Sequence, residues 1–297
     1  MVRPANFGFN PQTAVNNAFQ TRNKDLTSEE VATKAKEEFD QLVDKLRAVG
    51  ITVIVIEDTK EPIKKDAIFP NNWFTTHTNG SIITYPMFAP IRRLERREDI
   101  IKLLEDKFNY SKRIHLEFHE EDNQFLEGTG SIILDRVNRI LFACKSVRTH
   151  EGVLSELCEG SDFEKIVFDA LDESNIPIYH TNVMMALGET FCVICLDSIK
   201  NKAQRKILQD KLMSSGKEII EISFQQMNAF AGNMLHLRGK GDETYLVMSQ
   251  QAYDTLHDDQ IKQLEKHTNL LYSPINTIEF SGGGSVRCMI AEIFPPN

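Results

Sequence analysis

Five short polar loops recur along this chain at nearly constant spacing, and this repeat restricts the folds that it can adopt. The loops carry Asn72, Glu127, His180, Asn233 and Cys288, at intervals of 55, 53, 53 and 55 residues. Between them the hydrophobic pattern predicts two strands, a helix and a third strand, a ββαβ unit. A repeat of this length is typical of architectures in which each unit buries its apolar face on its neighbours. We therefore predict five units.

Five units that close into a ring would place one loop from each on the axis. Cys288, His180 and Glu127 would then converge despite their separation in sequence. Closure requires residues 2–10 to complete the unit opened by the last predicted strand, residues 289–294. The alternative is two α/β domains with a break near residues 148–160, but this arrangement leaves the even spacing unexplained. We therefore expect a single domain over residues 1–297.

Local signals predict the elements of each unit. A capping box at Thr27 begins a helix whose apolar stripe ends at Gly50, and Asn79-Gly80 predicts a hairpin turn. The other predicted helices are residues 92–108, 163–171, 203–213 and 259–266. The predicted strands are residues 51–56, 73–78, 81–85, 114–118, 131–134, 139–143, 176–179, 184–196 with a break at Gly188, 218–222, 234–237, 245–248 and 270–272.

Composition excludes several classes of partner. The chain is 41% apolar, which suffices for a substantial core, and its net charge of −9 argues against nucleic acid or an anionic membrane. The arginines at positions 92, 93, 96 and 97 alternate with acidic residues, which predicts a solvated helix face. No apolar run approaches the ~18 residues that span a bilayer, and we expect a cytoplasmic protein.

The five cysteines do not have the spacing of a disulfide framework. Their number is odd, which is consistent with a reducing compartment. Cys192 and Cys195 have CxxC spacing but lie within an apolar run without a second pair or nearby histidines, so we predict two core thiols and no metal site. Cys288 follows three consecutive glycines, which permit positive φ and close approach of a ligand. That turn fits a nucleophile, and equally fits a buried, inert cysteine at the start of a core strand.

A cysteine, a histidine and a carboxylate at the heads of repeats form the set that thiolate catalysis requires. His180 is predicted to end the strand 176–179 and to carry out proton transfer. Glu127 lies on a turn flanked by glycine. Asn71 and Asn72 lie between large apolar residues, so their amides need hydrogen-bond partners, which a bound polar ligand could supply.

Five ordered motifs resemble those of the guanidine-modifying superfamily, which includes arginine deiminases, dimethylarginine hydrolases and amidinotransferases. They are Phe69-Pro-Asn-Asn-Trp-Phe, Glu127-Gly-Thr-Gly, Ser146-Val-Arg-Thr149, His180-Thr-Asn182 and Gly282-Gly-Gly-Ser-Val-Arg-Cys288. The resemblance extends from Arg3 to Phe294 and is closest to the branch called citrulline utilisation hydrolases. It implies an α/β fold, the five-bladed α/β propeller (pentein) of pseudo-fivefold ββαβ repeats.

The resemblance also implies roles for individual residues. Cys288 would be the nucleophile, His180 the general acid and then base, and Glu127 the carboxylate that binds substrate nitrogen. Arg148 would hold a substrate α-carboxylate. Independently of the resemblance, the amide of Asn71 among large apolar residues makes it a candidate for substrate contact. Arginine-processing members carry aspartate at the positions of Asn72 and Asn182, which here are neutral.

These two neutral positions favour a neutral substrate. A buried guanidinium that loses its paired carboxylates keeps its desolvation cost, whereas a ureido group can both accept from and donate to amides. The predicted reaction is therefore hydrolysis of citrulline to ornithine, carbon dioxide and ammonia through an S-carbamoyl intermediate, without a metal or organic cofactor. The alternatives are a guanidine hydrolase or amidinotransferase that acts on arginine or a derivative of it and, from another class, a non-catalytic propeller that serves as a binding module.

Two polar residues remain outside this set. Asn233 is in phase with the other loops, and we expect it to cap backbone groups rather than contact substrate. Arg287 is excluded because neighbours on a strand face opposite sides. The expected partner is a small amino acid, with no nucleic acid and no membrane, and the sequence is compatible with an oligomer.

Overall fold

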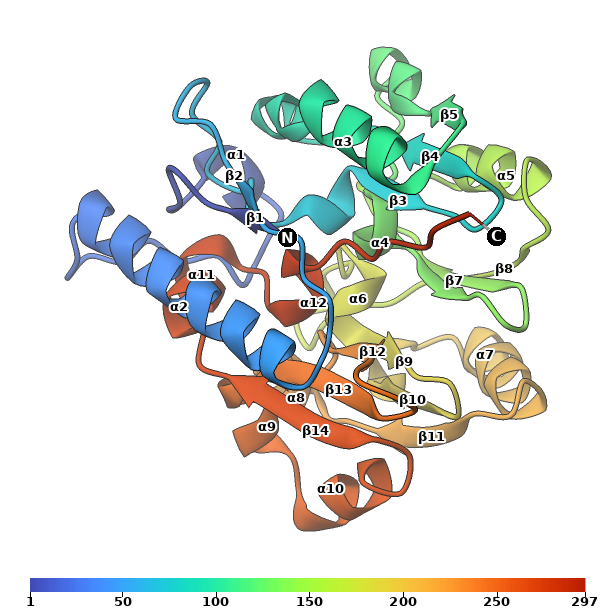
Figure 1. Cartoon of the computed structure of the whole chain (residues 1–297). Coiled ribbons are helices and arrows are strands. Elements are labelled where there is room, and N and C mark those ends of the chain that lie inside the picture. Colours follow the sequence, from blue (N-terminus) through green and yellow to red (C-terminus); the bar gives the residue numbers. More distant parts are fainter. Residues whose placement is uncertain (297) are drawn as a thin grey trace.

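Four of the predicted units form three-stranded mixed sheets in the computed structural model, which describes residues 1–296. In each sheet two antiparallel strands are followed by a helical connection and a third strand that is parallel to the second. This is the predicted ββαβ order, and the chain is therefore an α/β protein built from several small sheets (Figure 1).

The four sheets follow one another along the chain. The first contains β3 (Phe74–Thr76), β4 (Ser81–Thr84), α3 (Glu98–Phe108) and β5 (Lys112–His115). The second contains β6 (Ile133–Asp135), β7 (Ile140–Cys144), α5 (Glu151–Glu159) and β8 (Glu164–Phe168). The third contains β9 (Met185–Leu187), β10 (Phe191–Ile194), α7 (Lys202–Ser214) and β11 (Glu218–Glu221). The fourth contains β12 (Leu235–Arg238), β13 (Thr244–Ser249), α9 (Gln250–Thr255), α10 (Asp258–Leu264) and β14 (Asn269–Ser273).

The N-terminal segment forms a smaller unit. Its elements are β1 (Val2–Arg3), α1 (Pro11–Ala14), α2 (Ser28–Ala48) and β2 (Ile56–Glu57), and β1 pairs with β2 in parallel. The predicted capping box is confirmed, because Thr27 Oγ1 accepts from the Glu30 N–H while the Glu30 carboxylate accepts from the Thr27 N–H. The predicted apolar stripe of α2 is buried against β14 and α11 (Asn276–Gly282).

The predicted closing strand is wrong. Residues 289–294 do not form a strand, and β1 pairs with β2 instead. The C-terminal segment still lies against the first sheet, since the Phe294 N–H donates to Thr76 Oγ1 (2.8 Å) and Thr76 donates to the Glu292 carbonyl (3.1 Å). The C-terminal segment is thus held by hydrogen bonds to the Thr76 hydroxyl, and the expected strand pairing of residues 289–294 does not form.

Three further predictions are corrected. Residues 163–171 contain β8 and not a helix, because the β-branched segment Glu164–Phe168 pairs with β7, and the helix of this unit is α5, just before it. Residues 176–179 make only an isolated bridge between Leu171 and Pro177. Of residues 51–56 only Ile56 lies in a strand, because the partner strand β1 is two residues long.

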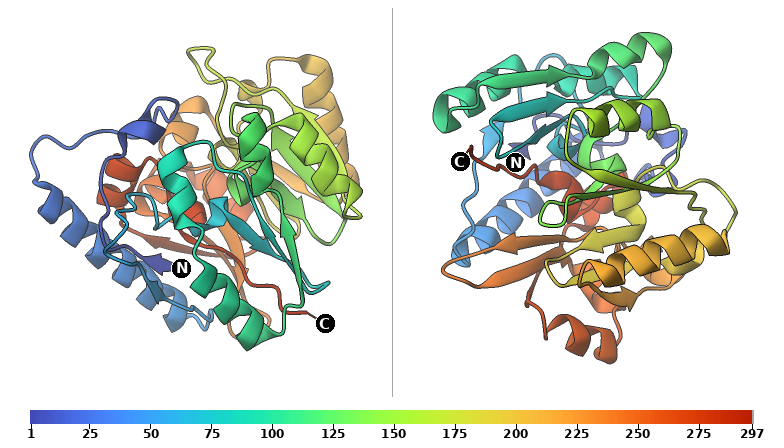
Figure 2. Two further views of the ribbon diagram at one scale, coloured as in Figure 1. Left: turned by 90° about the horizontal axis from the view of Figure 1, so that it is seen from above. Right: turned by 90° about the vertical axis from the view of Figure 1, so that its right-hand side faces the viewer.

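Short helices meet in the middle of the molecule, with the sheets around them (Figures 1 and 2). The 3₁₀ helix η1 (Pro70–Asn72) contacts α4 (Gly128–Ser131) and α12 (Val286–Met289), and α4 contacts α6 (Thr181–Met184). Each of the four contains or directly follows one of the repeat loops, so the repeat brings these loops together. The remaining helices are α8 (Phe224–Asn228) and the 3₁₀ helices η2 (Pro90–Glu95), η3 (Glu117–Asp122) and η4 (Leu196–Ser198).

The prediction that Cys192 and Cys195 are core thiols is confirmed. Cys192 and Cys195 are fully buried in the largest hydrophobic cluster. Of the helices in residues 1–296, none combines the length and the apolar character that crossing a bilayer requires.

Candidate active site

The central short helices border a small cavity of about 20 Å³, which holds about one water molecule. Of the seven predicted site residues, Asn72, Arg148, His180 and Cys288 line this cavity, whereas Asn71, Glu127 and Asn182 do not. The other lining residues are Thr13, Asn17, Asp66, Phe69, Arg92, Tyr179 and the glycines 282–284. An amino acid can enter only if some of these residues move.

Cys288 lies on α12 and not on a strand as predicted. The glycine turn before it is needed for two reasons. Gly283 has φ +61 and ends α11 in the left-handed region, and a Cβ on Gly284 would lie 3.0 Å from the Phe69 ring. The Cys288 side chain is buried, and its Sγ accepts hydrogen bonds from Asn182 Nδ2 (3.4 Å) and Asn233 Nδ2 (3.3 Å).

His180 and Glu127 form a buried pair beside this cavity. His180 precedes α6, Glu127 precedes α4, and His180 Nε2 lies 2.8 Å from Glu127 Oε2. The other edge of the imidazole packs on Gly130, where a Cβ would lie 2.8 Å from Nδ1. Burial lowers the pKa of His180 to about 4, although the adjacent Glu127 carboxylate acts to raise it. His180 is therefore neutral at pH 7.

This low pKa predicts that His180 does not titrate between pH 5.5 and 8. An unfolded histidine binds its proton near pH ~6.5, so the contribution of His180 to stability is present above that pH and is lost as pH falls toward 4. We expect the His180 Cε1–H resonance, assigned by its loss in His180→Gln, to keep the shift of neutral imidazole over this range. Titration of the assigned resonance near pH ~6.5 would contradict the prediction.

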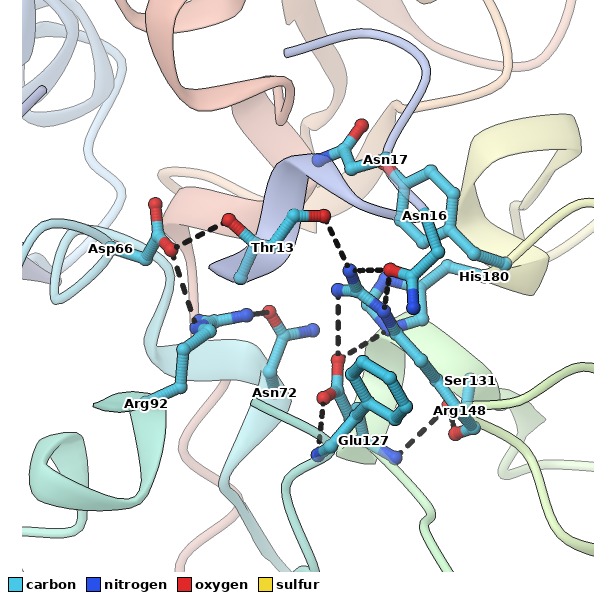
Figure 3. A network of polar contacts seen from close by, with 12 residues as sticks. Thr13, Asn16, Asn17, Asp66, Asn72, Arg92, Glu127, Ser131, Arg148 and His180 are labelled. Carbon is cyan, nitrogen blue, oxygen red and sulfur yellow. Dashed lines mark hydrogen bonds and ion pairs between the residues drawn. The ribbon is translucent and has the colours of Figure 1, made fainter. Parts of the chain in front are cut away.

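Glu127 is the acceptor at the centre of the polar network in Figure 3. Its carboxylate accepts from the Phe88 N–H (2.9 Å), His180 and Arg148 Nη1 (3.3 Å). Burial acts to raise the pKa of Glu127, but Arg148, His180 and Arg92 outweigh it and hold the pKa far below its ordinary value. Glu127 therefore stays ionised and compensates the charge of the buried arginines.

Arg148 is already bonded within the protein. Nε donates to Asn16 Oδ1 (3.0 Å), Nη2 donates to the Thr13 carbonyl (3.2 Å), and the guanidinium stacks on Tyr179 with 4.9 Å to the ring centroid. The N-terminal segment thus occupies the donors that the sequence assigned to a substrate carboxylate (Figure 3). Asn16 and Thr13 were not predictable from the repeat, because neither is in phase with it.

The prediction that the basic cluster around Arg92 forms a solvated face is wrong for Arg92. This side chain is buried on η2, pairs with Glu95 through Nε (2.9 Å) and Nη2 (2.8 Å), and donates from Nη1 to Asn72 Oδ1 (2.9 Å). The predicted helix begins only at Glu98. Alternation of charge does not reveal which arginine is buried, although Pro90, at the start of η2, is a local signal of a break.

Asp66 is a second buried charged residue, besides Arg92, that was not predicted from the sequence. Its Oδ2 accepts from Asn10 Nδ2 (2.6 Å) and Thr13 Oγ1 (3.3 Å), whereas Oδ1 is buried without a hydrogen-bond partner. Burial raises the pKa of Asp66 despite the nearby Arg92. The carboxyl group is thus biased toward its neutral form.

The remaining asparagines differ in their surroundings. Asn72 Nδ2 and both polar side-chain atoms of Asn71 are buried without partners. Asn233 was expected to cap backbone groups, and it donates both to the Asn182 carbonyl (2.9 Å) and to Cys288 Sγ. Arg287 bonds the Ile290 carbonyl (3.0 Å) and Glu292 (3.2 Å). Arg287 does not line the cavity, and its exclusion from the site stays a prediction, but the reason for it was wrong because α12 is a helix and not a strand.

Comparisons with known proteins agree with this fold. The chain is similar over residues 3–295 to the model of the family described as N,N dimethylarginine dimethylhydrolase, eukaryotic. No curated protein matches the chain. Among solved structures, the N-terminal domain of ArgZ, an arginine dihydrolase from the ornithine-ammonia cycle in cyanobacteria, superposes with a TM-score of 0.74 at 16% identity and covers 99% of this chain and 97% of that one.

Two further structures extend the comparison. Unliganded AgrE has a TM-score of 0.75 at 18% identity and covers all of this chain, which spans 39% of AgrE. A dimethylarginine dimethylaminohydrolase mutant, in an adduct with S-methyl-L-thiocitrulline, has a TM-score of 0.65 at 14% identity, with 97% of this chain and 96% of that chain covered. The predicted guanidine-modifying superfamily and the predicted enzyme class, a hydrolase of non-peptide C–N bonds, are confirmed. The chain belongs to the N,N dimethylarginine dimethylhydrolase family.

Proposed function

We propose that this hydrolase cleaves a C–N bond of a ureido amino acid, converting citrulline to ornithine, carbon dioxide and ammonia with Cys288 as nucleophile. The observation that carries the proposal is the orientation of the Asn72 amide. Arg92 donates to Asn72 Oδ1, so Nδ2 is left unpaired beside Gly130 and the His180 ring. Asn72 therefore offers a donor.

A donor at this position distinguishes the two chemical classes of substrate. The ureido oxygen of citrulline accepts hydrogen bonds, whereas a guanidinium has N–H donors only. A guanidinium would also bring a third positive charge beside Arg92 and Arg148, whose own charges are already balanced by buried carboxylates. The Glu127 carboxylate is already engaged with Arg148, His180 and a backbone amide.

The proposed reaction proceeds in two steps. The thiol proton of Cys288 passes to His180 across their shared cavity, and the thiolate attacks the ureido carbon. Charge that develops on the ureido oxygen is stabilised by the Asn72 amide, and His180 then protonates the departing ornithine nitrogen. A water molecule deprotonated by His180 hydrolyses the S-carbamoyl thioester to carbamate and free thiol. Carbamate breaks down to carbon dioxide and ammonia.

The remaining proposed contacts bind the substrate at its ends. Asn182 Oδ1 has no partner in the structure and would accept from a ureido N–H. Arg148 would bind the α-carboxylate once Asn16 releases it, and Asp66 Oδ1 would accept from the α-amino group. Asn71 would reach substrate only when the cavity enlarges, because it does not line the cavity in this structure.

Arginine is the second candidate substrate. The matched family is named for a methylated arginine, and the similar ArgZ is described as an arginine dihydrolase bound to its substrate. In this chain the unpaired carboxylate oxygen that lines the cavity is that of Asp66. Binding of a guanidinium would have to ionise Asp66 against the effect of burial on its pKa.

Mass spectrometry of products from citrulline and arginine tests these two candidates. We expect ornithine from citrulline, with kcat/KM at least about 100-fold above that for arginine, because a mismatched buried charge costs several kcal/mol. Asn72→Asp should lower citrulline turnover about 10- to 100-fold, since a carboxylate replaces the donor. It should also reduce the ratio of kcat/KM for citrulline to that for arginine. Asp66→Asn makes the reverse exchange, an acid for its amide, and is the control for the change in charge. Turnover of arginine alone would refute the ureido assignment and leave the nucleophile untouched.

We further propose that the whole chain forms one five-bladed α/β propeller, a single domain that acts in the cytoplasm on a free amino acid. The four three-stranded sheets and the β1–β2 pair support this arrangement. A binding module without catalysis is the competing class. It would be favoured if Cys288→Ala left the cellular function intact.

A further inference from the structure

We propose that Asn233 is a further catalytic residue, which acts with Asn182 to stabilise the thiolate form of Cys288. The proposal deepens the proposed function and rests on the role of Cys288 as nucleophile. It does not depend on which substrate the thiolate attacks.

The orientation of the Asn233 amide is determined by a backbone acceptor. Nδ2 donates one hydrogen to the Asn182 carbonyl (2.9 Å) and lies 3.3 Å from Cys288 Sγ, which receives the second. Exchange of the amide oxygen and nitrogen would place two oxygens against each other at 2.9 Å, so Nδ2 is the atom 3.3 Å from the sulfur, while Oδ1 lies 3.6 Å from it and accepts from the thiol. Asn182 Nδ2 supplies a second donor at 3.4 Å.

These two amides are the donors bonded to Sγ in the part of the chain that the structure describes. The two cations that line the cavity have other partners, since Arg92 is bonded to Glu95 and Arg148 to Glu127. Arg287 bonds Glu292, and neutral His180 provides no positive charge. A thiolate accepts hydrogen bonds far more strongly than a thiol does, so the two N–H donors outweigh the one long bond (3.6 Å) that the thiol donates to Asn233 Oδ1.

The loop that carries Asn233 is packed too tightly for the amide to turn away. A Cβ on Gly232 would lie 2.3 Å from the Val183 carbonyl, so this loop rests directly on α6. The Asn233 N–H donates to the Phe230 carbonyl (2.8 Å), and Phe230 has φ +65. Asn233 is therefore a buried side chain on a well-defined turn, which preorganises the donor before substrate binds.

The pH dependence of thiol alkylation tests this inference without any substrate. Iodoacetamide modifies thiolates, so the rate of Cys288 carboxamidomethylation, followed by peptide mass spectrometry, reports the pKa of this thiol. We expect Asn233→Ala to raise the pKa by about one unit through loss of one donor. Asn233→Asp should raise it further, because a carboxylate at the same position repels the thiolate.

Controls separate this effect from a loss of structure. Cys288→Ala identifies the peptide signal, and Asn228→Leu, a change at an exposed asparagine five residues away, should leave the thiol pKa unchanged. A structural role for Asn233 would give similar pKa values in the Ala and Asp variants. Thiol pKa values within about 0.3 units of the wild type in both variants would overturn the proposal, whichever amino acid the enzyme hydrolyses.

Discussion

Cys288→Ala is expected to lower turnover of citrulline and of arginine by at least about 10⁴-fold, because covalent catalysis loses its nucleophile. Neutral His180, paired with Glu127, remains as a base that can activate water. Without the thiol, however, water must attack the substrate directly and no thioester intermediate forms. The measurement is kcat from ornithine formation by mass spectrometry, together with thermal unfolding to verify the fold.

The half-buried Cys158 provides the matched control, since it is a free thiol that does not line the cavity. Cys158→Ala should retain turnover within about twofold, as expected for a change that forms no reacting contact. Intact-mass analysis during turnover should detect a carbamoyl adduct, and peptide mapping should place it on Cys288. An adduct on any other residue would disprove the assignment.

Glu127→Gln is expected to destabilise the protein by about 3–5 kcal/mol, the usual result of removing one partner from buried ion pairs. The glutamine leaves Arg148 without its carboxylate and reduces the negative charge beside Arg92. It also exchanges a charged acceptor at His180 for a neutral amide, so turnover should fall with stability. Urea unfolding at pH 7 measures the free energy.

The pH dependence of this difference is itself a prediction. The folded-state pKa of Glu127 is depressed, so its contribution is present above the unfolded value of ~4.3 and is lost as pH falls through the folded pKa. The stability gap between the wild type and Glu127→Gln should therefore shrink in acid. The same change at exposed Glu121 should alter stability by less than about 0.5 kcal/mol. Equal stabilities of the two variants at pH 7 would contradict the account.

Features encoded by neighbouring residues were predictable from the sequence. The capping box of α2 needs only Thr27 and Glu30, and the β3–β4 hairpin needs only the turn at Asn79-Gly80. The even spacing of the repeat loops was equally visible, because each unit is built from local pairings. Where the local pattern was ambiguous the prediction failed, as at β8, since short apolar β-branched segments become strands only when a partner such as β7 lies alongside.

The sequence by itself therefore determined the ββαβ units, the phase of their loops and the identity of the motif residues. Only the tertiary structure decided which polar side chains are buried together. Arg148 bonds Asn16, which lies 132 residues away in the sequence. Arg92, expected on the surface, is buried and donates to Asn72. Asn233 bonds the sulfur of Cys288, 55 residues away. A periodic pattern records the side on which a residue lies within its own unit. The partner that offsets the desolvation cost of a buried charge comes from another unit, so the two groups meet only when the units pack.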